Sequence, residues 1–149
     1  MHTIRPWLCV GSYRDSLDGD LLRANQIGAL LHLESMVRHP GVAGLYLPVE
    51  DAAPLAPDTL AQGLDFVRAA RLADTTILIA CAAGVSRSVA FACAALVEQE
   101  GLDLLAAYRA IRAAHRQALP HHLLWHSLCA YYAQPIAYQQ VVDAFCAHG

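Results

Sequence analysis

The chain has 149 residues, of which 56% are hydrophobic and 15% are charged, and its formal net charge is −3. This length suits one domain with one sizeable core, and the composition excludes an intrinsically disordered chain. The ten basic residues form no stripe along the sequence, which argues against a nucleic-acid partner.

Short apolar runs alternate with helical patterns in the first half of the chain. We expect strands and helices, in chain order, at Trp7–Val10 (strand), Asp20–Ala24 (helix), Ile27–Leu33 (strand), Gly44–Leu47 (strand), Pro57–Leu72 (helix) and Thr76–Ala80 (strand). The rest of the chain reads as helices, the first over Val89–Glu100 and the others around residues 104–111, 124–131 and 138–145. This order predicts an α/β fold with a mainly parallel central sheet flanked by helices.

The five cysteines are widely spaced and include no Cys-x-x-Cys pair. An odd count with this spacing argues against a disulfide framework and against a zinc site. The N-terminus lacks the pattern of a secretion signal, and no apolar run reaches the length of a membrane span. We therefore expect a cytoplasmic chain with no membrane attachment, and its oligomeric state stays open.

The most informative stretch follows the last predicted strand and opens a predicted helix. It reads Cys81-Ala82-Ala83-Gly84-Val85-Ser86-Arg87-Ser88. A loop that opens a helix collects unpaired N–H groups and the positive end of the helix dipole, so it favours an anion. The same field stabilises Cys81 as a thiolate, and Arg87 offers a planar fork that matches two phosphate oxygens. The pattern indicates displacement at phosphorus by sulfur.

This run resembles the signature loop of the cysteine-dependent protein phosphatases, Cys-x5-Arg followed by Ser or Thr, and looks most like the small dual-specificity branch. Weaker matches follow in family order at residues 4–12, 45–51 and 111–120. The resemblance implies a single catalytic domain over residues 1–149 that needs no metal or other cofactor. One position departs from the family pattern, because Ala80 stands where a histidine usually precedes the cysteine.

Cys81 is the expected nucleophile, forming a phosphocysteine, and Arg87 is expected to bind the equatorial phosphoryl oxygens. A proton donor is needed for the leaving oxygen, and the resemblance favours Asp51 for this role over Glu50 and Asp58. By resemblance Ser88 hydrogen-bonds Cys81 and helps the sulfur leave, while an ordinary first-turn serine is an equal interpretation. Backbone N–H groups complete the expected substrate cradle, and they belong to Ala82, Ala83, Gly84, Val85, Ser86 and Arg87.

The loop side chains also bear on the substrate. Ala82, Ala83 and Val85 are small and uncharged. In the family that the loop resembles, phosphoinositide-selective members typically have lysine or arginine among these positions, so the resemblance disfavours an inositol lipid. The chain is too short for the added elements that deepen the pocket in the larger tyrosine-specific branch of the family, so the resemblance implies a shallow pocket. Such a pocket admits phosphotyrosine on a protein, or a simple aryl phosphate, and leaves phosphoserine and phosphothreonine open.

Two rival functions remain from the sequence, and a metal site is disfavoured. The fold could be a phosphate-binding module with little catalysis, an alternative that Ala80 sharpens. Cys81 could instead transfer sulfur or act in redox chemistry, but sulfurtransferases of the rhodanese type generally have a loop one residue shorter. His122 and His126 are spaced for one helix face, yet the glutamate of a metalloprotease helix is missing.

Overall fold

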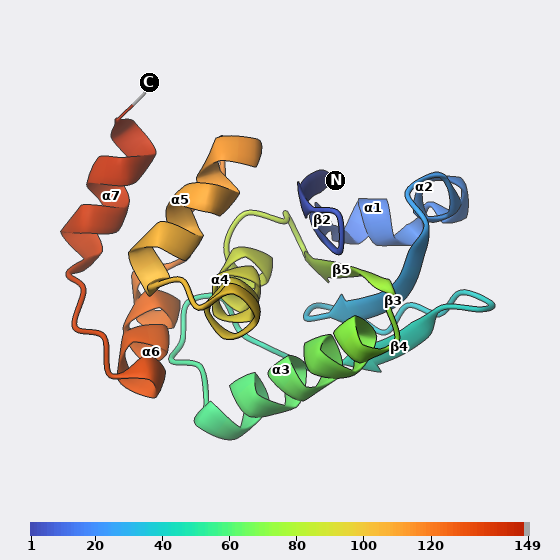
Figure 1. Cartoon of the computed structure of the whole chain (residues 1–149), viewed down its shortest axis with the longest axis horizontal. Coiled ribbons are helices and arrows are strands. Elements are labelled where there is room, and N and C mark those ends of the chain that lie inside the picture. Colours follow the sequence, from blue (N-terminus) through green and yellow to red (C-terminus); the bar gives the residue numbers. More distant parts are fainter. Residues whose placement is uncertain (148–149) are drawn as a thin grey trace.

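The computed structural model describes residues 1–147 and shows a five-stranded sheet with helices on both faces (Figure 1). The strands are β1 (His2–Arg5), β2 (Leu8–Ser12), β3 (Ile27–His32), β4 (Ala43–Tyr46) and β5 (Thr76–Cys81). Their order across the sheet is β1-β2-β5-β3-β4, with β1 antiparallel to β2 and the other neighbours parallel. The predicted α/β class with a mainly parallel sheet is confirmed.

Seven helices lie within the described residues. They are α1 (Tyr13–Leu17), α2 (Gly19–Ala24), α3 (Pro57–Leu72), α4 (Arg87–Glu100), α5 (Leu104–Ala114), α6 (His122–Tyr132) and α7 (Tyr138–Cys146). Helices α3 and α4 pack on one face of the sheet and α1 and α2 on the other, while α5, α6 and α7 gather beyond α4 (Figure 1). No helix within residues 1–147 is long and apolar enough to cross a bilayer.

The central strand β5 is buried on both faces, as a parallel strand between two helical layers must be. Its residues alternate between the two cores because successive side chains point to opposite faces. Ile79 and Cys81 join the large core beneath α4, whereas Leu78 and Ala80 join a smaller cluster with Leu22 of α2. Cys81 therefore leaves the sheet on the side where α4 begins.

Two short elements were not predicted. Strand β1 has four residues, and only Ile4 among them is buried, so its apolar pattern is too weak to read. Helix α1 has five residues and is set by a capping box rather than by periodicity. In that box Asp15 N donates to Ser12 Oγ at 3.1 Å and Ser12 N donates to Asp15 Oδ2 at 3.0 Å.

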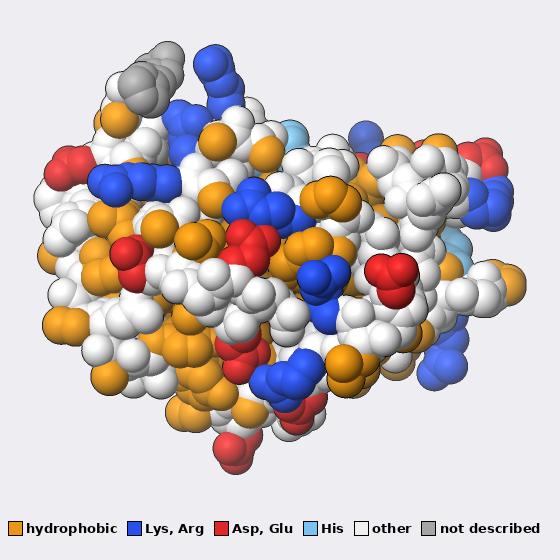
Figure 2. All heavy atoms as spheres, viewed as in Figure 1, with side chains coloured by type: hydrophobic (Ala, Val, Ile, Leu, Met, Phe, Trp, Pro, Cys, Tyr) orange, Lys and Arg blue, Asp and Glu red, His pale blue; other side chains and the backbone are white. Residues whose placement is uncertain are grey.

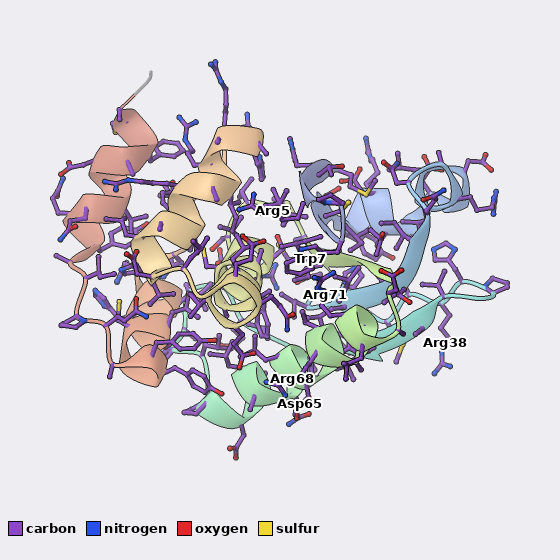
Figure 3. All side chains as sticks on the ribbon, in the orientation of Figure 1. Arg5, Trp7, Arg38, Asp65, Arg68 and Arg71 are labelled. Carbon is purple, nitrogen blue, oxygen red and sulfur yellow. The ribbon has the colours of Figure 1, made fainter. Side chains whose placement is uncertain are left out.

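Arginines tie α3 to its neighbours. The Arg71 guanidinium lies 4.5 Å from the Trp7 ring centroid, which joins α3 to the β1–β2 turn (Figure 3). Arg68 pairs with Asp65 in its own helix and with Glu98 of α4 at 3.0 Å. On the face drawn in Figure 2, arginines lie among acidic side chains rather than in a continuous basic surface.

Candidate active site

The Cys81–Arg87 segment leaves the carboxyl end of β5 and enters α4 at Arg87. The turn requires glycine at its centre. Gly84 has φ +76, and a Cβ there would lie 2.7 Å from the carbonyl carbon of Gly11 and 2.8 Å from its oxygen. Both the left-handed conformation and the close approach of β2 therefore exclude a side chain at this position.

The carbonyl groups of this loop are held from outside by other parts of the fold. Their donors are Leu33 N to Ala80 O (2.9 Å), Tyr13 N to Ala82 O (3.1 Å), His115 Nε2 to Gly84 O (2.8 Å), Leu119 N to Val85 O (2.8 Å) and Ala90 N to Ser86 O (2.9 Å). Four of these donors are backbone amides, and only His115 uses a side chain. The carbonyls of Ala82, Gly84, Val85 and Ser86 thus all accept a hydrogen bond, as does that of Ala80 near the end of β5.

The N–H groups of the same loop have no such partners. Within residues 1–147, none of the backbone N–H groups from Ala82 to Arg87 donates a hydrogen bond to another protein group. Ala82 and Ala83 are exposed, whereas the other four residues are buried or half-buried, where an N–H group normally finds an acceptor. Six consecutive free donors at a helix N-terminus form a strong anion-binding arrangement. These six are the residues that the sequence assigned to substrate binding.

Cys81 is 2% exposed, and its Sγ donates to Ser88 Oγ at 3.2 Å. Ser88 is the second residue of α4 and is fully buried, while the N-cap of that helix is Ser86. The serine hydroxyl therefore faces the sulfur instead of capping the helix. Burial raises the pKa of Cys93 and of Cys9, so these two cysteines stay as thiols in the core.

The Arg87 guanidinium is 12% exposed and is fixed on one side by two contacts. Its Nη1 donates to Glu34 Oε2 at 2.5 Å and to Val49 O at 2.9 Å. Both contacts use the same nitrogen, so the Nε–Nη2 edge has no hydrogen-bond partner among the described residues. That edge is the one that can bind two oxygens of a phosphoryl group.

Asp51 lies beside the loop on the segment that follows β4. This segment is held along the continuation of β3, because Leu47 N donates to His32 O at 2.9 Å and Val49 N to Leu33 O at 3.2 Å. Ser86 Oγ donates to Asp51 Oδ1 at 2.5 Å, and the same hydroxyl accepts from His121 N at 2.9 Å. Asp51 and its competitors Glu50 and Asp58 are all exposed, and of the three only Asp51 makes a hydrogen bond to the loop.

A depression of about 410 Å³ lies next to the loop and is lined by Tyr13, Glu34, Ser35 and Ala82. A second hollow of about 430 Å³, formed mainly by residues 36–44, contains none of the predicted site residues. Of the predicted site residues, only Ala82 lines the first depression, which therefore lies beside the loop.

Sequence reasoning missed Glu34, Tyr13 and the individual role of His115. Glu34 lies two residues beyond the end of β3, and the carboxyl ends of parallel strands share one edge of a sheet, so its position carried a usable signal. His115 carried none, because the contact of a helix C-cap with a distant loop depends on tertiary structure. Buried His32 also went unnoticed; it lies opposite Ala80 in the β3–β5 register and accepts from Glu34 N and Ser35 N through Nδ1, each at 3.1 Å.

His122 and His126 are neighbours on α6, with ring centroids 5.9 Å apart. Within residues 1–147, no group of three or more His, Cys, Asp or Glu side chains is placed to hold a metal ion. No described arrangement adds support to the disfavoured zinc site.

Comparisons with known proteins fit this geometry. The family model described as "Dual specificity phosphatase, catalytic domain" matches residues 8–134. Human dual specificity protein phosphatase 16 is 30% identical over 115 residues, which is 73% of this chain but 17% of that protein. Human dual specificity protein phosphatase 22 is 28% identical over 123 residues, covering 80% of this chain and 67% of that protein.

Solved structures extend the likeness over most of the chain. Human DUSP28 superposes with a TM-score of 0.83 at 27% identity, covering 89% of this chain and 96% of that chain. A mouse putative dual specificity phosphatase, in complex with zinc tungstate, gives a TM-score of 0.81 at 27% identity, covering 96% of this chain and 88% of that chain.

Proposed function

Because this chain belongs to the dual specificity phosphatase family, we propose that it hydrolyses phosphate monoesters on proteins through a phosphocysteine intermediate. Phosphotyrosine is the substrate class we expect, with phosphoserine and phosphothreonine as further candidates. The observation that carries the proposal is the row of six unpaired N–H groups, Ala82 to Arg87, that follows Cys81 in the loop. A tetrahedral dianion supplies the acceptors that this row lacks.

In the first step, the Cys81 thiolate attacks phosphorus opposite the ester oxygen, and the bond from phosphorus to that oxygen breaks. The loop N–H groups and the Nε–Nη2 edge of Arg87 stabilise the charge that builds on the three equatorial oxygens. Asp51 delivers the proton to the leaving oxygen. Its Oδ1 already accepts from Ser86, so Oδ2 is the oxygen that would carry the proton.

In the second step, water attacks phosphorus, Asp51 takes a proton from that water, and the bond from phosphorus to sulfur breaks. The sulfur leaves as a thiolate, which accepts hydrogen bonds and cannot donate them. The Ser88 hydroxyl, which accepts from the Cys81 thiol at 3.2 Å, would reverse and donate to the thiolate. Ser88 therefore assists the departure of the sulfur.

The alternative is a phosphate-binding module with little catalysis. Ala80 is fully buried in the apolar cluster with Cys9, Leu30 and Leu78, so no polar side chain supports the cysteine from that position. Such a module would bind oxyanions through the same loop and would turn over slowly or not at all.

Steady-state hydrolysis of p-nitrophenyl phosphate and of a phosphotyrosyl peptide tests the proposal. Cys81→Ser should abolish turnover, whereas Cys146→Ser, which changes an exposed cysteine on α7, should leave turnover unchanged. Asp51→Asn should slow the peptide by about 100-fold, and an ester with a more acidic leaving group by less. Equal losses on both esters would remove Asp51 from the role of proton donor.

Binding separates the alternatives. Tungstate is a tetrahedral oxyanion, and the mouse relative is complexed with zinc tungstate, so tungstate is a suitable competitor here. Competition by tungstate together with turnover supports the phosphatase. Binding without turnover in the wild type would favour the module, and sulfur transfer from thiosulfate would overturn both.

A further inference from the structure

We infer that His115 is a positioning residue of the phosphate loop: its imidazole holds the Gly84 carbonyl outward so that the Val85 N–H faces the bound oxyanion. The chemical identity of that oxyanion as phosphate rests on the proposed function. The contact between His115 and the loop does not depend on the proposed function, because the structure shows it directly.

The hydrogen bond defines the tautomer of the ring. His115 Nε2 lies 2.8 Å from Gly84 O, and a carbonyl oxygen only accepts, so Nε2 must carry the hydrogen. The other ring nitrogen, Nδ1, is buried and has no hydrogen-bond partner. A proton there would be buried without an acceptor, so the ring is neutral with its hydrogen on Nε2. Burial accordingly lowers the pKa of His115, which is 3% exposed.

The ring is held in place from two sides. His2 of β1 stacks on it with a centroid separation of 3.7 Å and an interplanar angle of 10°. His115 is also the C-cap of α5, where its N–H donates to Ile111 O at 2.8 Å. Four residues later, Leu119 N binds Val85 O. One short connection between α5 and α6 thus anchors two successive carbonyls of the loop.

Peptide geometry turns this anchor into an effect on the anion site. Gly84 C=O and Val85 N–H belong to one planar trans peptide and point in opposite directions. Fixing the carbonyl outward therefore fixes the N–H inward. Gly84 has φ +76 and is the residue at which a peptide flip meets least steric resistance. The His115 side chain therefore holds the loop at Gly84, the residue whose lack of a side chain leaves the backbone most free to rotate.

The test measures oxyanion affinity in matched variants. The affinity for orthovanadate is read from its protection of Cys81 against alkylation at pH 7, with the Cys81 peptide quantified by mass spectrometry. His115→Met removes the donor at similar volume, and His115→Gln restores an N–H near the position of Nε2. His126→Met alters an exposed histidine of α6 that makes no hydrogen bond to the loop.

His115→Met should weaken vanadate binding by about tenfold or more, since one hydrogen bond to a charged group is lost from the aligned set. His115→Gln should recover most of the affinity, and His126→Met should match the wild type. Wild-type affinity in His115→Met, or no recovery in His115→Gln, would overturn the inference. Vanadate binding without ester turnover in the wild type would reject the proposed enzyme but leave this comparison intact.

A measurement on the unaltered protein covers the case in which His115→Met does not fold. Nitrogen-15 shifts of the imidazole should identify His115 as neutral with its hydrogen on Nε2 at pH 7, and these shifts should move when vanadate is added. A hydrogen on Nδ1, or ring shifts that ignore vanadate, would refute the assignment.

Discussion

Gly84→Ala should remove the anion site and destabilise the protein more than an equivalent change elsewhere. Gly101 gives the matched control, because it has φ +69 and an added Cβ would meet nothing within 4 Å, whereas at Gly84 the Cβ would meet the backbone of Gly11 at 2.7 Å. Both substitutions place alanine in the left-handed region, at a cost of about 1–2 kcal/mol. Only Gly84→Ala adds a backbone clash, for which about 1–3 kcal/mol is typical.

For a chain of this length, 1 kcal/mol shifts the melting temperature by about 2–4 °C. Calorimetry should therefore show Gly101→Ala lower than the wild type by a few degrees and Gly84→Ala lower again by a similar amount. Vanadate protection of Cys81 should be lost in Gly84→Ala and kept in Gly101→Ala. Equal melting temperatures for the two variants, with vanadate binding retained in both, would refute the claim that the Gly11–Gly84 approach shapes the loop.

The free energy of unfolding should fall as the pH drops below about 6.5, the pKa of an unfolded histidine. Burial lowers the pKa of His32 and of His115 in the folded protein, so below that pH the unfolded chain binds protons that the folded chain does not. Urea unfolding from pH 8 to pH 5 measures this slope, and His32→Asn should flatten it. Ser88→Ala should slow hydrolysis of the phosphocysteine by about 10- to 100-fold. The slower second step should appear as a larger pre-steady-state burst of p-nitrophenol, and an unchanged burst would contradict the role of Ser88. Gly63→Ala should destabilise the protein, because the new Cβ would lie 2.4 Å from Cε1 of buried Phe91. This loss should exceed the gain of about 1 kcal/mol in helix propensity. In a double-mutant cycle, Phe91→Leu should restore part of the lost stability.

The strands and helices that carry strong apolar patterns could be predicted from the sequence. Strand β5 and helix α4 are apolar over most of their length, and the loop between them has a dense motif. Strand β1 and helix α1 could not be predicted, because one buried residue and one capping box leave no periodic signal. The elements that could be predicted are longer and have more buried positions than the two that could not.

The candidate site shows the same division. The segment with Asp51 could be expected near Cys81 from the family resemblance, and the structure brings Asp51 into contact with Ser86 of the loop. The catalytic roles of these residues stay predictions. The place of Glu34 just beyond β3 is a signal for the edge of the sheet, but its contact with Arg87 appears only in the fold. His115 could not be assigned, since it resembles a solvated polar residue until the fold brings it to Gly84.

The six unpaired N–H groups from Ala82 to Arg87 also link the binding of an oxyanion to the stability of the folded protein. The residues that bind the loop carbonyls come from distant parts of the chain, from Tyr13 to Leu119. Local unfolding of the connection between α5 and α6 would therefore abolish the affinity for an oxyanion while β5 and the Cys81–Arg87 motif stay folded. An oxyanion that fills the row stabilises only the fully assembled state, by about 2.7 kcal/mol at a hundredfold excess over its dissociation constant. Inorganic phosphate in the surrounding medium would therefore act as a conformational stabiliser of this protein, in addition to being the product of the proposed reaction.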